Sequence, residues 1–250
     1  MRKDDRIRRP RSGKRKKSMS KGGGIVTLLA LVLCIFFYGA HDYAPENRDE
    51  IPDTMAVSQY EGTPYMEVNG NIPFFEEEDY LREAFEEYAP LDELGRCGVA
   101  FANVCEETMP TEERGSIGAV KPSGWHTVKY NGVVDGNYLY NRCHLIAYML
   151  TGENANVCNL ITGTRYMNVE GMLPFETAVA DYVKDTGNHV LYRVTPVFTG
   201  DNLVADGVLM EASSVEDAGE GLSFCVFVFN VQPGIEIDYE TGDSRMDTLH

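Results

Sequence analysis

The distribution of charge along the chain is the feature that most restricts how it can fold. Residues 1–24 carry 11 Lys/Arg against two Asp, and the run that follows, Ile25–Ala40, carries no charge. Together with Gly22–Gly24, this run reaches about the lower limit for a helix that crosses a bilayer. A basic block stays on the cytoplasmic side of a membrane. The remaining 210 residues are therefore expected outside it.

A cleaved signal peptide is the alternative interpretation of the same run. Its end, Tyr38-Gly39-Ala40, places a bulky side chain where a cleavage site needs a small one. We therefore expect an uncleaved transmembrane anchor at residues 25–40, preceded by a basic cytoplasmic segment at residues 1–24. The predicted location is the cell membrane, with a single pass and an extracellular C-terminal domain; secretion after cleavage is the alternative.

Beyond the anchor the chain is strongly acidic, with 11 Lys/Arg against 37 Asp/Glu and a net charge of -26. Such acidity argues against broad electrostatic attraction to nucleic acid and is compatible with recruiting divalent cations. Two interpretations are open for the basic residues of the central region. They either form a local cationic groove on an acidic body or are separate solvated charges. The residues are Arg114, Lys121, Lys129, Arg142 and Arg165.

Five cysteines lie beyond the anchor, an odd number that leaves at least one free thiol or an intermolecular bond. One disulfide and none are equally compatible with this count. No C-x-x-C spacing occurs, which argues against a structural zinc site.

The polar residues 41–59 are typical of a linker, residues 60–242 are long enough for one domain, and residues 243–250 are expected to be a loose tail. Apolar spacing predicts a short helix over Glu76–Leu91 and a longer one over Leu173–Gly187, with Pro174 in its first turn and Gly187 at its end.

Strand patterns begin at Gly95–Val104. Two further strands are expected around the Asn-Gly and Asp-Gly turn at Asn131–Gly136, and more follow after Asn188. Strands, one packed helix and more strands predict an α+β fold.

The stretch "YLYNRCHLIAYMLTGENANVCNLITGTRYMN", Tyr138–Asn168, contains the candidate chemistry. A neutral His144 could deprotonate water, and Arg142, two residues earlier on an extended chain, could grip a phosphate. Asn159, Asn168 and Glu176 follow at spacings of nine and eight residues. Because Mg²⁺ takes oxygen ligands and keeps several waters, these parts describe a one-metal phosphodiesterase. Asn154 and Asn156 are interpreted as turn residues.

The motif "NRCH" with Asn159, Asn168 and Glu176 resembles the Asp-Arg-Gly-His region of the DNA/RNA non-specific endonucleases, which are ββα-metal nucleases. The resemblance extends from about Tyr60 to Gly242. It implies a ββα-metal finger embedded in an antiparallel sheet, and cleavage of DNA, or also RNA, that leaves 5′-phosphates with little sequence preference.

By this resemblance His144 is the general base and Asn168 the protein ligand of Mg²⁺, with Mn²⁺ or another divalent cation as alternatives. Asn159 supports the geometry of the site, and Glu176 holds a metal-bound water. Arg142 contacts the region of the scissile phosphate, and Arg114 is a candidate second substrate cation.

Two positions depart from the motif, because Asn141 stands where the family has Asp and Cys143 where it has Gly. The first substitution removes a carboxylate that could orient other groups of the site. The second adds a Cβ at a position where glycine leaves the backbone more conformational freedom. A Cys143–Cys158 bridge is conceivable, but two small buried residues are the preferred interpretation. The rival functions are a non-catalytic nucleic-acid- or protein-binding module on a nuclease fold and a cation-binding surface domain.

Overall fold

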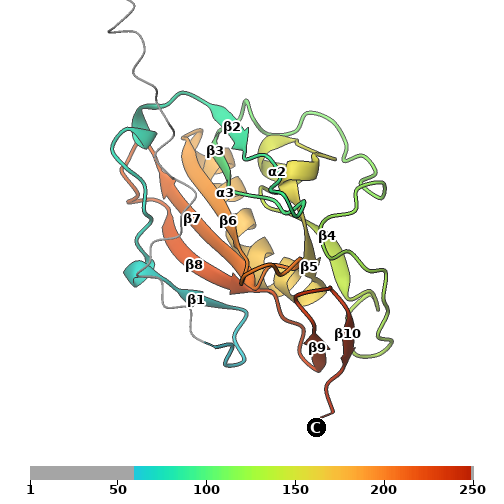
Figure 1. Cartoon of the computed structure of the whole chain (residues 1–250). Coiled ribbons are helices and arrows are strands. Elements are labelled where there is room, and N and C mark those ends of the chain that lie inside the picture. Colours follow the sequence, from blue (N-terminus) through green and yellow to red (C-terminus); the bar gives the residue numbers. More distant parts are fainter. Residues whose placement is uncertain (1–58, 249–250) are drawn as a thin grey trace, which may run out of the picture. The chain divides into compact units, whose positions relative to one another are not determined.

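The computed structural model describes residues 59–248. They form a six-stranded antiparallel sheet, in the order β1-β8-β7-β6-β3-β2, with the 14-residue helix α3 packed on one face (Figure 1). The strands are β1 (Tyr65–Glu67), β2 (Phe85–Tyr88), β3 (Ala100–Val104), β6 (Val190–Val197), β7 (Gly207–Ser214) and β8 (Ser223–Phe229). The α+β class predicted from the sequence is confirmed.

Helix α3 (Leu173–Thr186) confirms the longer predicted helix. Pro174 occupies its first turn, as predicted. Gly187 ends it in the left-handed conformation with φ of 70°, and its N–H donates to the carbonyl of Val183. The buried side of the helix, with Val179 and Val183 fully shielded from solvent, packs into the main core. Burial of this apolar stripe fixes the helix on the sheet.

A π-helical turn, η4 (Met167–Met172), precedes α3 without a break. The N–H of Leu173 donates to the carbonyl of Asn168, five residues back. Pro174 explains the wider turn, because it has no N–H and its ring would collide with the carbonyl of Glu170 in a regular helix. Asn168 is the second residue of this turn.

Strands β4 (Tyr140–His144) and β5 (Leu160–Thr164) pair with each other in a separate two-stranded ladder. With α3 they make a ββα unit that packs beside the six-stranded sheet, rather than being embedded in it as predicted. Asn230 fastens the two parts together: its amide N–H₂ donates to the carbonyls of Thr162 (3.0 Å) and Ala205 (2.9 Å). The ββα unit is therefore held by hydrogen bonds as well as by the shared apolar core.

The prediction of a short helix over Glu76–Leu91 is wrong. This segment holds a single 3₁₀ turn, η2 (Asp79–Leu81), followed by the edge strand β2. Phe85 packs edge-on against Phe101 of β3, with ring centroids 4.9 Å apart, and the guanidinium of Arg82 lies 3.4 Å from the centroid of the Phe85 ring. Pairing with β3 and this aromatic packing outweigh a modest helix propensity.

Two strand expectations also need correction. Of the pair expected around the Asn131–Gly136 turn, only the second forms a strand, β4; the first is reduced to one bridge between Lys129 and Tyr138. The tail expected to be loose instead forms β10 (Ser244–Met246), which pairs with β9 (Ile235–Ile237).

The remaining short elements are η1 (Asn69–Asn71), α2 (Tyr148–Thr151) and η3 (Val157–Asn159). Within residues 59–248, no helix is long and apolar enough to span a membrane. The predicted anchor at residues 25–40 lies outside the described residues. All five cysteines of the described part are free thiols, so Cys143 and Cys158 are not bridged, as preferred from the sequence.

Candidate active site

A cleft of about 780 Å³ opens beside the ββα unit. It is lined by residues from the segment before β4, from β4 itself, and from α2, η4 and α3. Five of the six site residues predicted from the sequence line it: Arg114, Arg142, His144, Asn168 and Glu176. The sixth, Asn159, is completely buried behind them. The fold thus brings together residues that are up to 62 positions apart in the sequence.

His144 ends strand β4 and is only 6% exposed. Its Nε2 lies 2.8 Å from the backbone carbonyl of Asn154, and its Nδ1 lies 3.2 Å from Nη2 of Arg114. A carbonyl can only accept a hydrogen bond and a guanidinium can only donate one. The proton is therefore on Nε2, and Nδ1 presents its lone pair to Arg114.

The surroundings of His144 keep the imidazole neutral. Burial lowers the pKa of His144 below its usual 6.5, and the positive charge of Arg114 lowers it further, against an opposing contribution from the Asn154 hydrogen bond. A neutral ring with a fixed tautomer is the form that can take a proton from water.

Asn159 sits at the end of η3 and clamps the backbone two residues beyond His144. Its Oδ1 accepts from the N–H of Ile146 at 2.8 Å, and its Nδ2 donates to the Ile146 carbonyl at 3.0 Å. The neighbouring backbone bond, from Leu145 N–H to the Asn159 carbonyl at 2.9 Å, continues the β4–β5 ladder. These bonds fix the end of the strand from which the imidazole projects.

Asn168 lies in η4 on the wall of the cleft. Its Oδ1 accepts a hydrogen bond from the thiol of Cys143, with Sγ 3.0 Å away. Burial raises the pKa of Cys143 well above its usual range, and the nearby Glu176 carboxylate raises it further, so the thiol keeps its proton. Cys143 also adopts an ordinary strand conformation without positive φ, so its backbone does not need the conformational freedom of glycine.

Glu176 projects from the first turn of α3 and is 6% exposed. Burial raises its pKa from 4.5 to about 8, although the positive charge of Arg114 acts in the opposite direction. A carboxyl group that is desolvated this strongly gains from any cation placed beside it. The same environment suits a carboxylate that binds a metal or its water.

Arg142, predicted to contact phosphate, lies on the cleft wall but is bound to the chain itself. Its Nε donates to the carbonyl of Val120 at 2.5 Å and its Nη2 to the carbonyl of Gly118 at 2.8 Å. Its guanidinium also stacks 4.0 Å above the ring of Trp125. In this structure Arg142 therefore fastens the loop at residues 118–125, whereas Arg114 is the arginine that reaches His144.

The cleft is locally cationic even though the chain is acidic. Three arginines line it, Arg114, Arg142 and Arg165, against one carboxylate, Glu176. Lys121 and Lys129, which we grouped with them from the sequence, do not line it. Aromatic rings of Trp125, Tyr138, Tyr140 and Tyr148 complete the walls. This combination of cations and rings fits a polyanion whose bases can stack.

Two asparagines near His144 have surroundings that the sequence did not indicate. Asn154, interpreted as a turn residue, supplies the carbonyl that fixes the tautomer of His144. A backbone carbonyl has no sequence signature, so no pattern could have identified it. Asn141, at the Asp position of the motif, lines the cleft, and its buried Nδ2 has no hydrogen-bond partner within residues 59–248.

The oxygen atoms on the cleft wall fit a hard divalent cation. Asn168 Oδ1 receives only the weak thiol donor of Cys143, which leaves a lone pair for a cation, and Glu176 supplies a carboxylate in the same cleft. Within residues 59–248, no group of three His, Cys, Asp or Glu side chains converges to form a metal cage. Few protein ligands with most positions left to water is the arrangement that Mg²⁺ takes beside a phosphate substrate.

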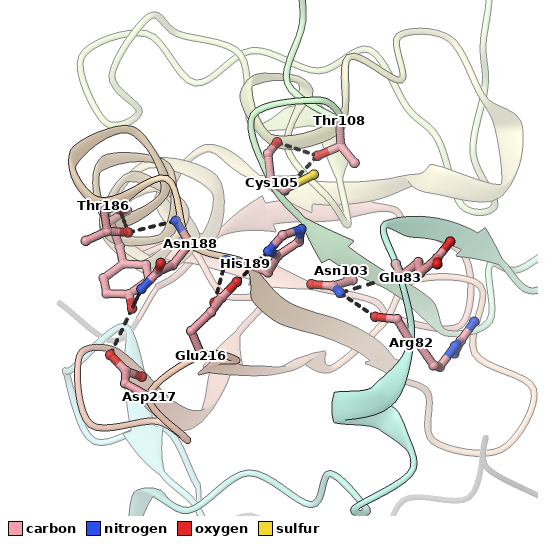
Figure 2. Close-up of polar contacts among 11 residues, drawn as sticks. Arg82, Glu83, Asn103, Cys105, Thr108, Thr186, Asn188, His189, Glu216 and Asp217 are labelled. Carbon is pink, nitrogen blue, oxygen red and sulfur yellow. Dashed lines mark hydrogen bonds and ion pairs between the residues drawn. The ribbon is translucent and has the colours of Figure 1, made fainter.

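Two other histidines of the described residues, His189 and His126, do not line the cleft. His189 precedes β6 and pairs with Glu216, with Nδ1 and Oε1 2.6 Å apart (Figure 2). His126 is 46% exposed, and its Nε2 lies 3.1 Å from the carbonyl of Thr241.

Comparisons with known proteins point to the same chemistry. The sequence model of a family described as DNA/RNA non-specific endonuclease matches residues 78–216. The metal-free crystal structure of NucA from Streptococcus agalactiae superposes with a TM-score of 0.65 and 28% identity, over 76% of this chain and 89% of NucA. NucA with a bound magnesium ion gives 0.65 and 26%, over 75% and 93% of the two chains. Sda1 nuclease with a bound zinc ion gives 0.61 and 25%, over 74% and 97%.

Proposed function

Because the chain belongs to the DNA/RNA non-specific endonuclease family, and is thus a metal-dependent nuclease, we propose that residues 60–242 hydrolyse DNA with Mg²⁺ and without strong sequence preference. RNA is the second substrate, and Mn²⁺ or another divalent cation the alternative metal. The related NucA structure contains magnesium and the Sda1 structure zinc, which supports a divalent ion. The products carry 5′-phosphates.

The observation that carries this proposal is the orientation of His144. Its Nε2–H is held by the Asn154 carbonyl, so the lone pair of Nδ1 is on the side of Arg114, which lines the same cleft as Asn168 and Glu176. A neutral imidazole in this position can accept a proton from a water molecule as the water oxygen bonds to phosphorus. The bond between phosphorus and the 3′ oxygen then breaks, and that oxygen takes a proton from solvent.

Arg114 couples this step to substrate binding. In the structure its Nη2 occupies the lone pair of His144 Nδ1 at 3.2 Å. A phosphate oxygen is a stronger acceptor for a guanidinium than a neutral imidazole is. A bound phosphate therefore draws Arg114 away from Nδ1 and leaves that nitrogen free to bind the attacking water. Arg142 keeps the loop at residues 118–125 against the cleft and adds positive charge for the scissile phosphate.

Asn168 Oδ1 would be the protein ligand of the ion, and the Glu176 carboxylate would hold one of its water molecules. A bound divalent cation supplies electrostatic stabilisation of the charge on the phosphoryl oxygens and on the leaving oxygen. Asn159 acts by fixing the backbone at Ile146 and hence the end of β4. Phosphate and metal contacts carry no base information, which accounts for weak sequence preference.

We further propose the arrangement of the whole chain that the charge pattern predicts. Residues 1–24 lie in the cytoplasm, residues 25–40 anchor the chain in the cell membrane, and residues 41–59 link the anchor to an extracellular nuclease domain. Secretion after cleavage remains the alternative. Protease digestion of intact cells tests this, because an extracellular domain is degraded from outside and a cytoplasmic one is protected.

Plasmid nicking tests the catalytic proposal. A fragment from Tyr60 to His250 should relax and then linearise supercoiled plasmid with Mg²⁺, and chelation by EDTA should stop it. His144→Ala should bind plasmid in a mobility-shift assay without nicking it. Equal nicking by wild type and His144→Ala would refute His144 as the base. Binding by the wild type with no nicking under any divalent cation would instead indicate the non-catalytic binding module.

A further inference from the structure

The thiol of Cys143 touches the side chain on which the proposed metal site depends. Its Sγ lies 3.0 Å from Asn168 Oδ1 and 3.5 Å from the sulfur of Met172. A thiol has one hydrogen to donate, and an amide oxygen is a much better acceptor than a thioether sulfur. The hydrogen bond therefore goes to Asn168.

Packing fixes the position of this thiol. Cys143 is completely buried in strand β4, and a Cβ placed on Gly163 of the neighbouring strand would lie 2.7 Å from its Cβ and 3.2 Å from its Sγ. The absence of a side chain at Gly163 thus makes the room that Cys143 fills. Asn168 in turn is held by the π-helical turn, whose Leu173 N–H bonds its carbonyl. Packing therefore fixes Cys143, and the turn fixes the backbone of Asn168.

The contact determines which end of the Asn168 amide is held. An asparagine can turn either its oxygen or its N–H₂ group to a given neighbour, and only the oxygen binds a cation. A donor thiol bonds the oxygen and disfavours the flipped amide, which would set N–H₂ against a weak acceptor. Because the oxygen has two lone pairs, one remains for an ion in the cleft.

We propose that Cys143 is a positioning residue for metal binding, whose thiol hydrogen bond holds Asn168 Oδ1 in the orientation that receives a divalent cation. This inference rests on the proposed function, because it takes Asn168 as the protein ligand. The glycine at this place in the family motif has no side chain to reach Asn168. Metal affinity in this chain therefore depends on a contact that the motif itself does not provide.

Binding of Mn²⁺ to the full chain without nucleic acid tests the proposal, measured by electron paramagnetic resonance of the free ion. Cys143→Ala removes the donor and should weaken Mn²⁺ binding about tenfold, the usual effect of losing a partner of a metal ligand. Cys143→Ser keeps a donor and should stay within about threefold of wild type. Cys225→Ala is the matched control, because Cys225 is equally buried but packs in the other core cluster; it should leave binding unchanged.

A second measurement does not depend on metal. The infrared S–H stretching band of Cys143, isolated by subtracting the spectrum of Cys143→Ala, should shift to higher frequency in Asn168→Ala, where the thiol loses its acceptor. Melting temperatures of all variants without metal check that each is folded. An unshifted band, or Mn²⁺ binding by Cys143→Ala as tight as wild type or tighter, would overturn the positioning role.

Asn168→Ala separates this failure from failure of the proposed metal site. If Asn168→Ala binds Mn²⁺ as well as wild type, or wild type does not bind Mn²⁺, the ligand assignment fails and the positioning role fails with it. If Asn168→Ala loses binding while Cys143→Ala retains it, only the positioning role fails.

Discussion

His144 and His189 lie in two polar regions of the same molecule and have opposite kinds of partner. His144 is 6% exposed, between the carbonyl of Asn154 and the guanidinium of Arg114. The side chain of His189 is 37% exposed and meets the carboxylate of Glu216, which also accepts from the His189 backbone N–H at 2.8 Å (Figure 2). One ring has a cation beside its Nδ1, and the other has an anion there.

This difference decides what each ring can do. A guanidinium must find a lone pair on Nδ1 of His144, whereas a carboxylate must find a proton on Nδ1 of His189. For Glu216, partial burial acts to raise the pKa, but the hydrogen bonds from His189 outweigh it and lower the pKa. The residue type alone therefore does not distinguish the two histidines. The charge of the neighbours makes His144 the one that we propose as the general base.

The largest effect is expected from removing each histidine in turn. His144→Ala should reduce the rate of plasmid cleavage by about 10²- to 10⁴-fold, the usual contribution of a general base. His189→Ala should leave cleavage within about twofold, because His189 does not line the cleft. Initial rates at saturating Mg²⁺ measure both. If folded His189→Ala loses as much cleavage activity as His144→Ala, the proposed difference between the two histidines is wrong.

Arg114→Ala should have the next largest effect, about a 10²-fold fall in kcat/KM, because it removes a cation that stabilises the phosphate. It should also change the pH profile. Catalysis needs neutral His144, and its pKa is held below 6.5 partly by Arg114, so the acidic limb of the wild type should have its midpoint below pH 6.5.

Without Arg114 the midpoint should move to higher pH, since the positive charge that opposed protonation is gone. Rates at constant ionic strength across the acidic range measure this shift. A midpoint that stays in place or moves down would show that Arg114 does not act on His144. Arg245→Ala, at an exposed arginine paired with Glu236, is the control for loss of charge alone.

Glu176 should make the stability of the metal-free protein depend on pH. Its folded pKa of about 8 lies above the usual 4.5, so the metal-free folded state keeps a proton that the unfolded state loses. This contribution is fully present below pH 4.5 and is lost as pH rises through about 8. Glu176→Gln cannot ionise and should remove the loss, which is about 3 to 4 kcal/mol between about pH 5 and about pH 8.

Urea unfolding in EDTA at the two pH values measures the free energy of unfolding for this comparison. Mg²⁺ should stabilise the wild type more than Glu176→Gln at the higher pH, because only the wild type can offer a carboxylate. Parallel pH dependence of the two proteins in EDTA would mean that Glu176 is already ionised in the metal-free fold.

The smallest effect is expected at the second region. His189→Gln should change the free energy of unfolding by less than about 1 kcal/mol, because its ion pair with Glu216 is partly exposed. Cleavage rates should not change. Urea unfolding near neutral pH measures the difference, and a loss of several kcal/mol would place His189 among the residues that hold the sheet together.

Local patterns were enough for part of the molecule. Pro174 and Gly187 marked helix α3, and the long apolar runs marked β6, β7 and β8. The spacing of His144, Asn168 and Glu176 predicted residues that do line one cleft. These signals work because capping, φ preference and alternation act within a few residues of the chain.

Other parts depended on contacts that no short window contains. Glu76–Leu91 has a helical pattern, but Phe85 is drawn into an edge strand by Phe101. The last strand, Ser244–Met246, follows from pairing with β9 rather than from its own residues. At Phe85 a weak local helical preference lost to a tertiary partner.

By itself the sequence determined the chemical parts of this protein: an imidazole, amide oxygens, a carboxylate and arginines, spaced as in the endonuclease family. Tertiary structure decided how they are used. It assigned the proton of His144 to Nε2 through a backbone carbonyl at Asn154, turned Arg142 toward its own loop, and set the thiol of Cys143 against Asn168. The physical reason is that protonation and amide orientation depend on hydrogen-bond partners a few ångströms away, and the fold alone chooses them.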